Sequence, residues 1–581
     1  MMKKLVCLIL ALSMAMLAGC AGSQQTTAGT TPTTVPAADP ATQPATVPVT
    51  QPDTTPDTTE PTAPPPTTPP TVPVEEVVCP PDNVIEITEM IERDNNKVVT
   101  EPSFEIPDKL AENPNAFRLP ALVSDRMLLQ ALAVNRIWGS CTEDGPVAVR
   151  LTDTETGNTQ VYYGNCENGA FLVYVGSNPH GMKVKLEIIT ASGSKKTIHD
   201  IIFGELFLGC GQSNMGWTVG QCYSGTTATL LYQEEIDSSY NEDIRLFGLL
   251  PNQSNSVVSD VYTSSTNGWQ IAQPHTIVNF SAASYFFARE LNRMYNVPVG
   301  VICSCMGGTD IYTWTPAEEA GECQGTVTDA STFYNAMIYP LRHVNARGVL
   351  WYQGEGSEAV YYAHNLSLLV QGWRRLFERD NLFFAIVQLP RYAANDSGSF
   401  ERREAQKEAA LSIPFCTYSV NIDLGTMTKD VAEGDDLNPY GIHPYDKLPL
   451  GNRLAHVVAK DVYHAEGVWS SPYLEAVTVE GNRAVLKYAN VGAGLVLRGQ
   501  AGFEILGSSG KTYACVPTLR SKTEVELTIP EGETIRMIRY GYASSSSLVN
   551  HMERYADCVS LYNTKNNNQV AYPAEQFIWK G

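Results

Sequence analysis

The chain has 581 residues, of which 43% are hydrophobic and 9% aromatic. That share can fill sizeable buried cores, so wholesale disorder is excluded, and the length suggests two to four domains at roughly 100–200 residues each. Lys and Arg number 40 against 62 Asp and Glu, which gives a formal net charge of −22. Because phosphate binding needs clustered basic side chains and no basic stripe is present, we expect no nucleic-acid partner.

The first twenty residues have the pattern of an export signal. Lys3 and Lys4 precede an apolar run over residues 5–17, which is too short to span a bilayer. The run ends in Leu17-Ala18-Gly19-Cys20, which resembles the lipobox of bacterial lipoproteins. The resemblance implies lipidation of Cys20 and an extracytoplasmic protein held at the bacterial cell surface by a lipid anchor alone. An ordinary secretory leader, with Cys20 incidental, is the alternative.

Composition divides the rest of the chain into four parts. Residues 21–110 are predicted to be a disordered Thr/Pro-rich stalk, because the tract over 21–76 has too few apolar side chains to offset its ordering entropy. Residues 111–203 alternate apolar and polar in short runs, which predicts a β-rich accessory domain. Residues 204–466 alternate strand-like runs with helical patterns and form the expected catalytic domain. From 467 to 581 short β runs return, which predicts a C-terminal β-rich segment.

The alternation in the third part indicates parallel βαβ units in a three-layer α/β sandwich. The expected strands are 204–209, 297–304, 348–352, 382–389 and 417–422, and helical patterns cover 281–291, 365–376 and 454–462. In doubly wound sheets, reactive groups occupy the loops at the carboxyl ends of the strands. The loops that follow these strands are therefore the expected place of a site.

Four loops carry candidate functional residues. They read Gly211-Gln212-Ser213-Asn214-Met215, Met306-Gly307-Gly308-Thr309, Trp351-Tyr352-Gln353-Gly354-Glu355 and Tyr440-Gly441-Ile442-His443-Pro444. A serine beside glycine at a strand end can project as a nucleophile, and adjacent glycines leave N–H donors for an oxyanion. Met215 stands where the G-x-S-x-G elbow needs its second glycine, so the α/β-hydrolase template does not fit. Together the loops supply a nucleophile, oxyanion donors, an acid and a base.

These blocks resemble those of the SGNH-type carbohydrate esterases and, within them, the sialate O-acetylesterase family. Other segments similar to that family are 127–130, 279–282, 334–341, 387–389, 538–542, 561–563 and 573–577. The resemblance covers residues 117–579 and leaves out the leader and the stalk. It implies an SGNH-like fold and a serine esterase that removes O-acetyl groups from sialic acids on glycans, with no metal or cofactor.

The resemblance also implies roles for single residues. Ser213 would be the nucleophile and His443 its general base. The oxyanion would be held by the Ser213 backbone N–H, by a backbone N–H of Gly307 or Gly308, and by the side-chain amide of Gln353.

The acid that orients His443 is open. Many SGNH enzymes have an aspartate three residues before the histidine, and here that position is Tyr440. Glu355 is the first choice because it lies in a neighbouring strand-end loop. Asp436 and Asp423 are alternatives, as is a dyad without a strong acid.

Two other functions are compatible with the same residues. One is an acetyl esterase for a different polysaccharide such as acetylated xylan, because the same machinery serves either sugar. The other is a carbohydrate-binding lipoprotein without activity. Sialic acid carries a carboxylate and needs a cationic or amide partner, for which Arg391 at a strand end is a candidate.

Cysteine usage points to neither a metal site nor a definite disulfide framework. Of the 13 cysteines, Cys7 and Cys20 belong to the leader, and the 11 that remain cannot all pair with one another. No C-x-x-C cluster suggests zinc. Cys303 and Cys305 alternate along an apolar run and are expected to be small buried side chains.

Overall fold

The structure is a computed structural model that describes residues 94–222, 230–263, 268–391, 396–425, 441–498, 502–542, 560–565 and 570–581. The leader with Cys20, most of the expected stalk, Asp436 and Tyr440 lie outside the described residues, so the expectations about them stay predictions. Within the part that is described, no helix is both long and apolar enough to cross a membrane.

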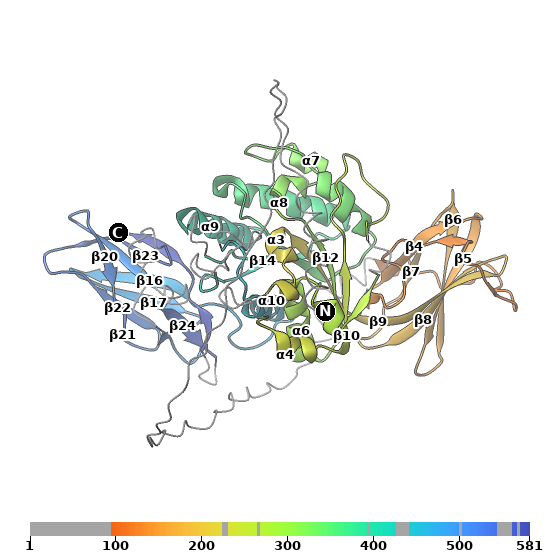
Figure 1. Ribbon diagram of the computed structural model, residues 1–581, viewed down its shortest axis with the longest axis horizontal. Helices are drawn as coiled ribbons and strands as arrows, with labels where there is room; N and C mark the ends of the chain where they lie inside the picture. Colours follow the sequence, from red (N-terminus) through yellow and green to blue (C-terminus); the bar gives the residue numbers. More distant parts are fainter. Residues whose placement is uncertain are drawn as a thin grey trace, which may run out of the picture. The chain divides into compact units, whose positions relative to one another are not determined.

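An antiparallel sheet, drawn in orange in Figure 1, precedes the α/β part of the chain. Its strands are β4 (Asn135–Cys141), β5 (Gly145–Asp153), β6 (Thr159–Glu167), β7 (Ala170–Val175) and β8 (Lys183–Thr190), with the short strand β2 (Phe117–Arg118) antiparallel to β4. Two further short strands, β1 (Ala111–Glu112) and β3 (Leu128–Gln130), pair in parallel with residues 194–195 and 202–204. Val147, Val149 and Leu151 alternate along β5 and are buried in the core. This alternation is the pattern that predicts the β-rich region.

One long strand, β9 (Ser194–Gly211), belongs to this sheet and to the α/β part. It pairs antiparallel with β8 and, further along, parallel with β12 (Val299–Cys305) and β13 (Gly348–Tyr352). Every residue of β9 from Ile201 onward is buried, as expected for a strand covered on both faces. The boundary expected between residues 203 and 204 falls inside β9, and the division into domains stays a prediction.

Six strands pair in parallel in the central sheet, in the order β10, β12, β9, β13, β14, β15. The remaining bounds are β10 (Asn241–Gly248), β14 (Phe383–Val387) and β15 (Cys416–Ser419). Each of the five apolar runs read from the sequence overlaps one of these strands. β11 (Gln270–Ala272) is antiparallel to β10, and β9 continues into the antiparallel sheet, so the sheet is mixed rather than wholly parallel.

Helices cover both faces of the central sheet. α6 (Ala282–Tyr295) and α10 (Leu448–Asp461) lie on one face, and α8 (Ala359–Leu376) and α9 (Asp396–Ser412) lie on the other (Figure 1). Successive side chains of β9 point to opposite faces of the sheet. Phe207 packs with side chains of α6 and α10, whereas Leu208 packs with side chains of α8. The central part is therefore a three-layer α/β sandwich.

Shorter helical turns connect these elements. They are α3 (Ser213–Gly216), η1 (Val219–Gln221), α4 (Gln233–Asp237), α5 (Pro274–Ile277), η2 (Ile311–Thr313), α7 (Ala317–Ala320), η3 (Tyr334–Ile338) and η4 (Tyr339–Leu341). α10 starts before the predicted helical pattern at 454 because Pro449 occupies its first turn, where a missing N–H costs nothing. Gly451 follows, and a Cβ there would lie 2.5 Å from the Cβ of Phe286, so glycine allows α10 to approach α6 closely.

The C-terminal residues form three small antiparallel sheets around a core of their own. The first sheet contains β16 (Tyr473–Glu480), β17 (Arg483–Ala489), β22 (Glu524–Thr528) and β21 (Thr518–Leu519). The second contains β20 (Thr512–Cys515), β19 (Phe503–Gly507), β23 (Ile535–Tyr540) and β26 (Phe577–Lys580). The third contains β18 (Val496–Leu497), β24 (Leu561–Thr564) and β25 (Val570–Pro573).

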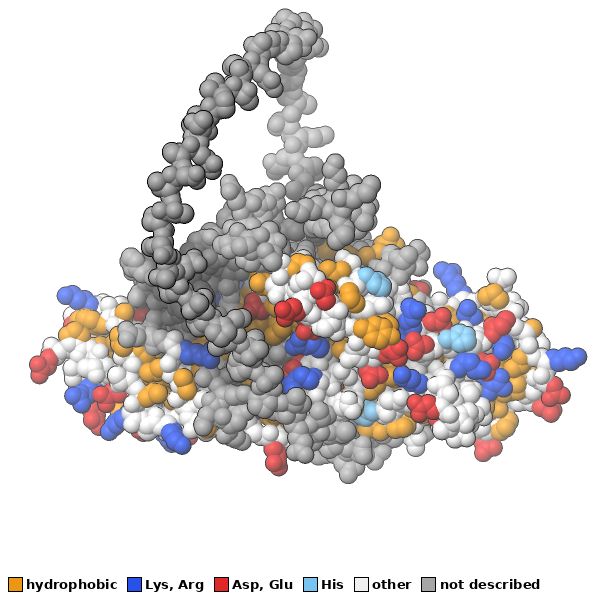
Figure 2. Space-filling view, turned by 60° about the horizontal axis from the view of Figure 1, so that its bottom comes forward, with side chains coloured by type: hydrophobic (Ala, Val, Ile, Leu, Met, Phe, Trp, Pro, Cys, Tyr) orange, Lys and Arg blue, Asp and Glu red, His pale blue; other side chains and the backbone are white. Residues whose placement is uncertain are grey.

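Charged side chains are mixed on the described part of the face drawn in Figure 2. On the face drawn in Figure 2, Lys and Arg side chains are interspersed with Asp and Glu, and the described part of that face shows no continuous basic patch. This distribution is that of an ordinary solvated surface rather than of a polyanion-binding one.

Candidate active site

The turn that carries Ser213 begins where β9 ends. Gly211 has a φ of +141°, and a Cβ on it would lie 2.0 Å from the carbonyl oxygen of Tyr352, so only glycine allows β9 and β13 to meet here. The backbone N–H of Gln212 donates to the same oxygen at 3.0 Å. Met215 is buried, and its carbonyl accepts a hydrogen bond of 2.5 Å from the Oγ of Ser281. The position of Ser213 is thus held from both sides.

Ser213 and His443 lie within hydrogen-bond distance of each other. The Nε2 of His443 is 2.8 Å from the Oγ of Ser213, although 230 positions separate the two residues in the chain. His443 is buried, and its ring stacks on the indole of Trp217 with 4.4 Å between centroids. Ser213 is partly exposed. A hydroxyl that contacts an imidazole nitrogen and reaches solvent is the arrangement that nucleophilic catalysis requires.

The glycine pair after β12 passes directly beside Ser213. A Cβ built on Gly307 would lie 3.1 Å from the Cβ of Ser213. Gly308 has a φ of +72°, and the space where its Cβ would point is open. The backbone N–H of Met306 donates to the carbonyl of Gly211 at 3.1 Å, which ties this loop to the end of β9. The structure therefore places Gly307 beside Ser213, and the oxyanion role of Gly307 and Gly308 stays a prediction.

Gln353 follows β13 and is fully buried. Its Nε2 donates to the carbonyl of Thr309 at 3.0 Å and to the Oγ of Ser357 at 2.9 Å. Its Oε1 is buried and has no hydrogen-bond partner within the described part of the chain. Both amide hydrogens are thus engaged, and donation to an oxyanion would require one of them to be released. The predicted role of Gln353 is therefore untested.

Glu355 contacts the loop of Ser213 rather than His443 itself. Its Oε1 accepts a hydrogen bond of 2.5 Å from the Nδ2 of Asn214, while its Oε2 is buried with no hydrogen-bond partner among the described residues. Burial raises the pKa of this carboxyl. The Nδ2 of Asn214 also donates to the carbonyl of Ile442, the residue before His443, at 3.1 Å. Glu355 therefore reaches the loop of His443 through one amide, and its orienting role stays a prediction.

Of the two alternative acids, Asp423 is described and Asp436 is not. Asp423 forms a bidentate ion pair with Arg453, at 2.6 and 2.7 Å. Its Oδ2 also accepts a hydrogen bond of 3.3 Å from the hydroxyl of Tyr562. The structure thus places Asp423 in an ion pair between β15, α10 and the C-terminal sheets.

Lys447 and Arg402 also contact the site, and sequence reasoning did not single them out. Lys447 is fully buried, and its Nζ donates to the Oδ1 of Asn214 at 2.5 Å. Arg402 of α9 is partly exposed, and its Nε donates to the carbonyl of Ser357 at 2.9 Å. Arg391, the predicted partner of a sugar carboxylate, is instead 1% exposed. Lys447 stands four residues after His443, and this spacing by itself gives no sign that the lysine is buried.

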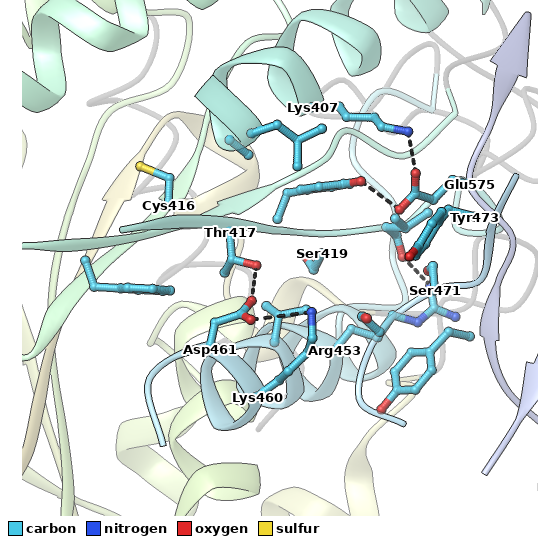
Figure 3. A pocket seen from close by; sticks show the side chains of 18 of the residues that line it. Lys407, Cys416, Thr417, Ser419, Arg453, Lys460, Asp461, Ser471, Tyr473 and Glu575 are labelled. Atoms are coloured by element: carbon cyan, nitrogen blue, oxygen red, sulfur yellow. Dashed lines mark hydrogen bonds and ion pairs between the residues drawn. The ribbon is translucent and has the colours of Figure 1, made fainter. Parts of the chain in front are cut away.

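Neither of two cavities in the described part of the chain is lined by Ser213 or His443. One, of about 230 Å³, is lined by Asp310, Ser357 and Glu358 among others, directly beyond the loops of Gly308 and Glu355. Another, of about 740 Å³, lies against β15 and α10, where Thr417 donates to Asp461 at 2.6 Å (Figure 3). None of the residues in the four predicted loops lines this second cavity.

Comparison with known proteins places the chain among carbohydrate esterases. Residues 204–433 match the family described as carbohydrate esterase, sialic acid-specific acetylesterase. A sialate O-acetylesterase of Pongo abelii is 25% identical over 410 residues, which cover 64% of this chain and 76% of that protein. The mouse (Mus musculus) sialate O-acetylesterase is 26% identical over 418 residues, covering 60% and 74%.

A solved structure agrees with the sequence relatives. A carbohydrate acetylesterase from Xanthomonas citri has a TM-score of 0.66 and 25% identity, and the match covers 80% of this chain and 99% of that one. The matched region of the family begins within β9 and includes the loops of Ser213, Gly307 and Gln353. The chain is a carbohydrate esterase, and its residues 204–433 match the sialic acid-specific acetylesterase domain.

Proposed function

We propose that this carbohydrate esterase is a serine esterase that removes O-acetyl groups from sialic acids on glycans. The observation that carries the mechanism is the 2.8 Å contact between the Oγ of Ser213 and the Nε2 of His443, with Gly307 against the same serine. The substrate part of the proposal is supported by the similarity to sialate O-acetylesterases.

In the proposed first step, His443 takes the proton of Ser213 as the Oγ attacks the acetyl carbonyl carbon. The carbonyl oxygen becomes an oxyanion that backbone N–H groups of Ser213 and of Gly307 or Gly308 would stabilise, each donor being worth about 3–4 kcal/mol of barrier. The imidazolium then gives its proton to the sugar oxygen as the bond from that oxygen to the carbonyl carbon breaks. Ser213 is left as an acetyl ester.

The second step repeats the first with water as the nucleophile. His443 takes a proton from water, whose oxygen attacks the acetyl carbonyl. The collapse of the second oxyanion releases acetate and returns the proton to the Oγ of Ser213. The partial exposure of Ser213 gives water access to the ester.

Arg402 supports an acidic sugar as substrate. Its Nε is held by the carbonyl of Ser357, and among the described residues no hydrogen bond or ion pair engages its two terminal nitrogens. Its positive charge acts on Glu355, which places the guanidinium near the loops of the site. A guanidinium anchored through one nitrogen can offer the other two to a carboxylate.

One observation favours a neutral sugar such as acetylated xylan instead. The cavity of about 230 Å³ beside the glycine loop is lined by Asp310 and Glu358, and its described lining contains no lysine or arginine. Carboxylates accept hydrogen bonds from sugar hydroxyls, but they repel an acidic sugar.

Acetate release by the full chain from 9-O-acetylated sialic acid and from acetylated xylan, compared side by side, tests the proposal. We expect faster release from the sialic acid and none from S213A above the rate without enzyme. Faster acetate release from acetylated xylan would be compatible with the serine mechanism but would contradict sialic acid as the substrate. Hydrolysis of p-nitrophenyl acetate at equal rates by wild type and S213A would refute the serine mechanism.

We further propose that a lipid on Cys20 anchors the protein to the bacterial cell surface. The support is the sequence of the leader, with two lysines, a short apolar run and Leu17-Ala18-Gly19-Cys20. Expression in a bacterial host should place the wild type in the membrane fraction and C20A in the soluble fraction. Equal partitioning of the two proteins would contradict the lipid anchor.

A further inference from the structure

Lys447 is buried at the start of α10, below the strand-end loops. Its side chain has no exposure to solvent, its Nζ donates to the Oδ1 of Asn214 at 2.5 Å, and the same nitrogen lies 5.1 Å from the centre of the Tyr352 ring. Burying an amine costs free energy unless a partner satisfies it. The amide of Asn214 and the ring of Tyr352 are the described partners that offset this cost.

The lysine restricts the amide of Asn214 to one orientation. In its ammonium form Lys447 can only donate, so Asn214 turns its Oδ1 toward the Nζ. Its Nδ2 then faces two acceptors, the carboxylate of Glu355 at 2.5 Å and the carbonyl of Ile442 at 3.1 Å. All hydrogen-bonding atoms of this buried amide are satisfied at once, which makes the arrangement rigid.

The amide lies between the two residues on which the proposed reaction depends. Asn214 follows Ser213 directly, and Ile442 precedes His443 directly. The bond from Asn214 to Ile442 therefore joins the loop of the nucleophile to the loop of the base, and Lys447 holds the amide that makes it. A misplacement of about 1 Å between reacting groups can cost on the order of 100-fold in rate.

We infer that Lys447 is a positioning residue, which acts through Asn214 to set the distance between the Oγ of Ser213 and the Nε2 of His443. This inference rests on the proposed function, in which those two atoms exchange a proton. Lys447 does not touch the substrate in this assignment, so its loss affects turnover rather than substrate binding.

The test compares K447M with K460M, because methionine keeps the apolar stem and removes the donor. Lys460 lies on the same helix, is 46% exposed and pairs with Asp461, so it serves as a matched control. With p-nitrophenyl acetate we expect K447M to lower kcat by about 10- to 100-fold with little change in KM, and K460M to match wild type. A kcat of K447M within twofold of wild type would overturn the inference.

Two further measurements separate positioning from a general loss of structure. The kcat of the double variant N214A/K447M should be less than twofold below that of N214A, because the amide through which Lys447 acts is already gone. If the two substitutions instead lower kcat by factors that multiply, the coupling is refuted. K447Q retains a neutral donor and should recover a substantial part of the kcat lost in K447M. Equal activities of K447Q and K447M would exclude the hydrogen bond as the cause.

The reaction of Ser213 with an organofluorophosphonate distinguishes this inference from the proposed function. If Ser213 is the nucleophile, labelling of the wild type is fast and labelling of S213A is absent. K447M should label more slowly by the factor that its kcat has lost, because the serine is less activated. Fast labelling of K447M with reduced kcat would refute the positioning role, whereas hydrolysis by S213A at the wild-type rate would refute the proposed function itself.

Discussion

The imidazole of His443 lies almost parallel to the indole of Trp217, with 4.4 Å between ring centroids and 20° between ring planes. The indole is itself fixed, because Trp217 is 4% exposed and its Nε1 donates to the carbonyl of Gln221 at 3.0 Å. The flat contact leaves the edge of the imidazole, with Nε2, facing Ser213. It also places an electron-rich face against the imidazolium that forms during the reaction.

Replacing Trp217 should therefore reduce turnover. We expect W217F to lower kcat by a few-fold and W217L by about tenfold, because a stacked cation on an aromatic face is worth about 0.5–2 kcal/mol. Steady-state kinetics with p-nitrophenyl acetate measure the effect, and thermal unfolding of each variant controls for lost packing. A kcat of W217L equal to that of wild type would show that the stacking does not assist the base.

Gly307 should be sensitive to a single methyl group. An added Cβ would lie 3.1 Å from the Cβ of Ser213, so G307A must displace the nucleophile or the loop by a few tenths of an ångström. We expect kcat to fall by about tenfold or more with little change in melting temperature. G308A is the matched comparison: its Cβ meets open space, but its φ of +72° makes alanine strained. That strain should appear in stability, at about 1–2 kcal/mol, rather than in kcat.

The acidic residues should separate into one that affects turnover and one that affects stability. E355Q replaces the carboxylate that holds Asn214 and should lower kcat by about tenfold or more, since hydrogen bonds to charged groups are worth about 1.5–3 kcal/mol. D423N leaves the guanidinium of Arg453 buried without its ion pair and should cost about 3–5 kcal/mol of unfolding free energy. The opposite pattern would assign the orienting role to Asp423, and a large kcat loss in D436N alone would assign it to Asp436.

Lys447 should make stability depend on pH in a predictable direction. Burial lowers its pKa from the ordinary 10.5 to about 7, against the opposing influence of Cys222, Glu355 and Asp446. Between these two pKa values the unfolded chain binds one more proton at this position than the folded chain. The free energy of unfolding therefore rises with pH across that window, by up to about 1.4 kcal/mol per pH unit, and the contribution of Lys447 is constant below pH 7.

The comparison with K447M isolates this contribution, because the Met variant lacks the titrating group. Denaturant unfolding of both proteins at several pH values from 7 to 10 measures it. The difference in unfolding free energy, wild type minus K447M, should grow as the pH rises. Parallel curves for the two proteins would show that the buried amine keeps an ordinary pKa.

The sequence predicts the parts of this molecule that follow from periodicity and strand order. The apolar runs that end at Gly209, Ser304 and Tyr352 mark strands because covered strands lack polar alternation. Parallel strands bring their carboxyl ends to one edge of the sheet, which is enough to expect Ser213, Gly307 and Gln353 together.

Other features depend on side-chain contacts that no local pattern encodes. Lysine is among the residues that are almost never fully buried, so Lys447 reads as a surface residue until the fold places it under Asn214. The sequence makes Glu355 the first choice to orient His443, but it does not predict that the described hydrogen bond of Glu355 goes to Asn214. A hydrogen-bonded amide between a carboxylate and a loop has no signature in the spacing of the sequence.

The length of β9 limits where this enzyme can be truncated. Its 18 residues are one continuous strand, shared by the antiparallel sheet and the parallel sheet, and its last residue stands two positions before Ser213. A deletion that ends inside the antiparallel sheet removes the hydrogen-bond partners of the strand that presents the nucleophile. A truncation within the antiparallel sheet would therefore disturb the strand that leads to the reaction centre.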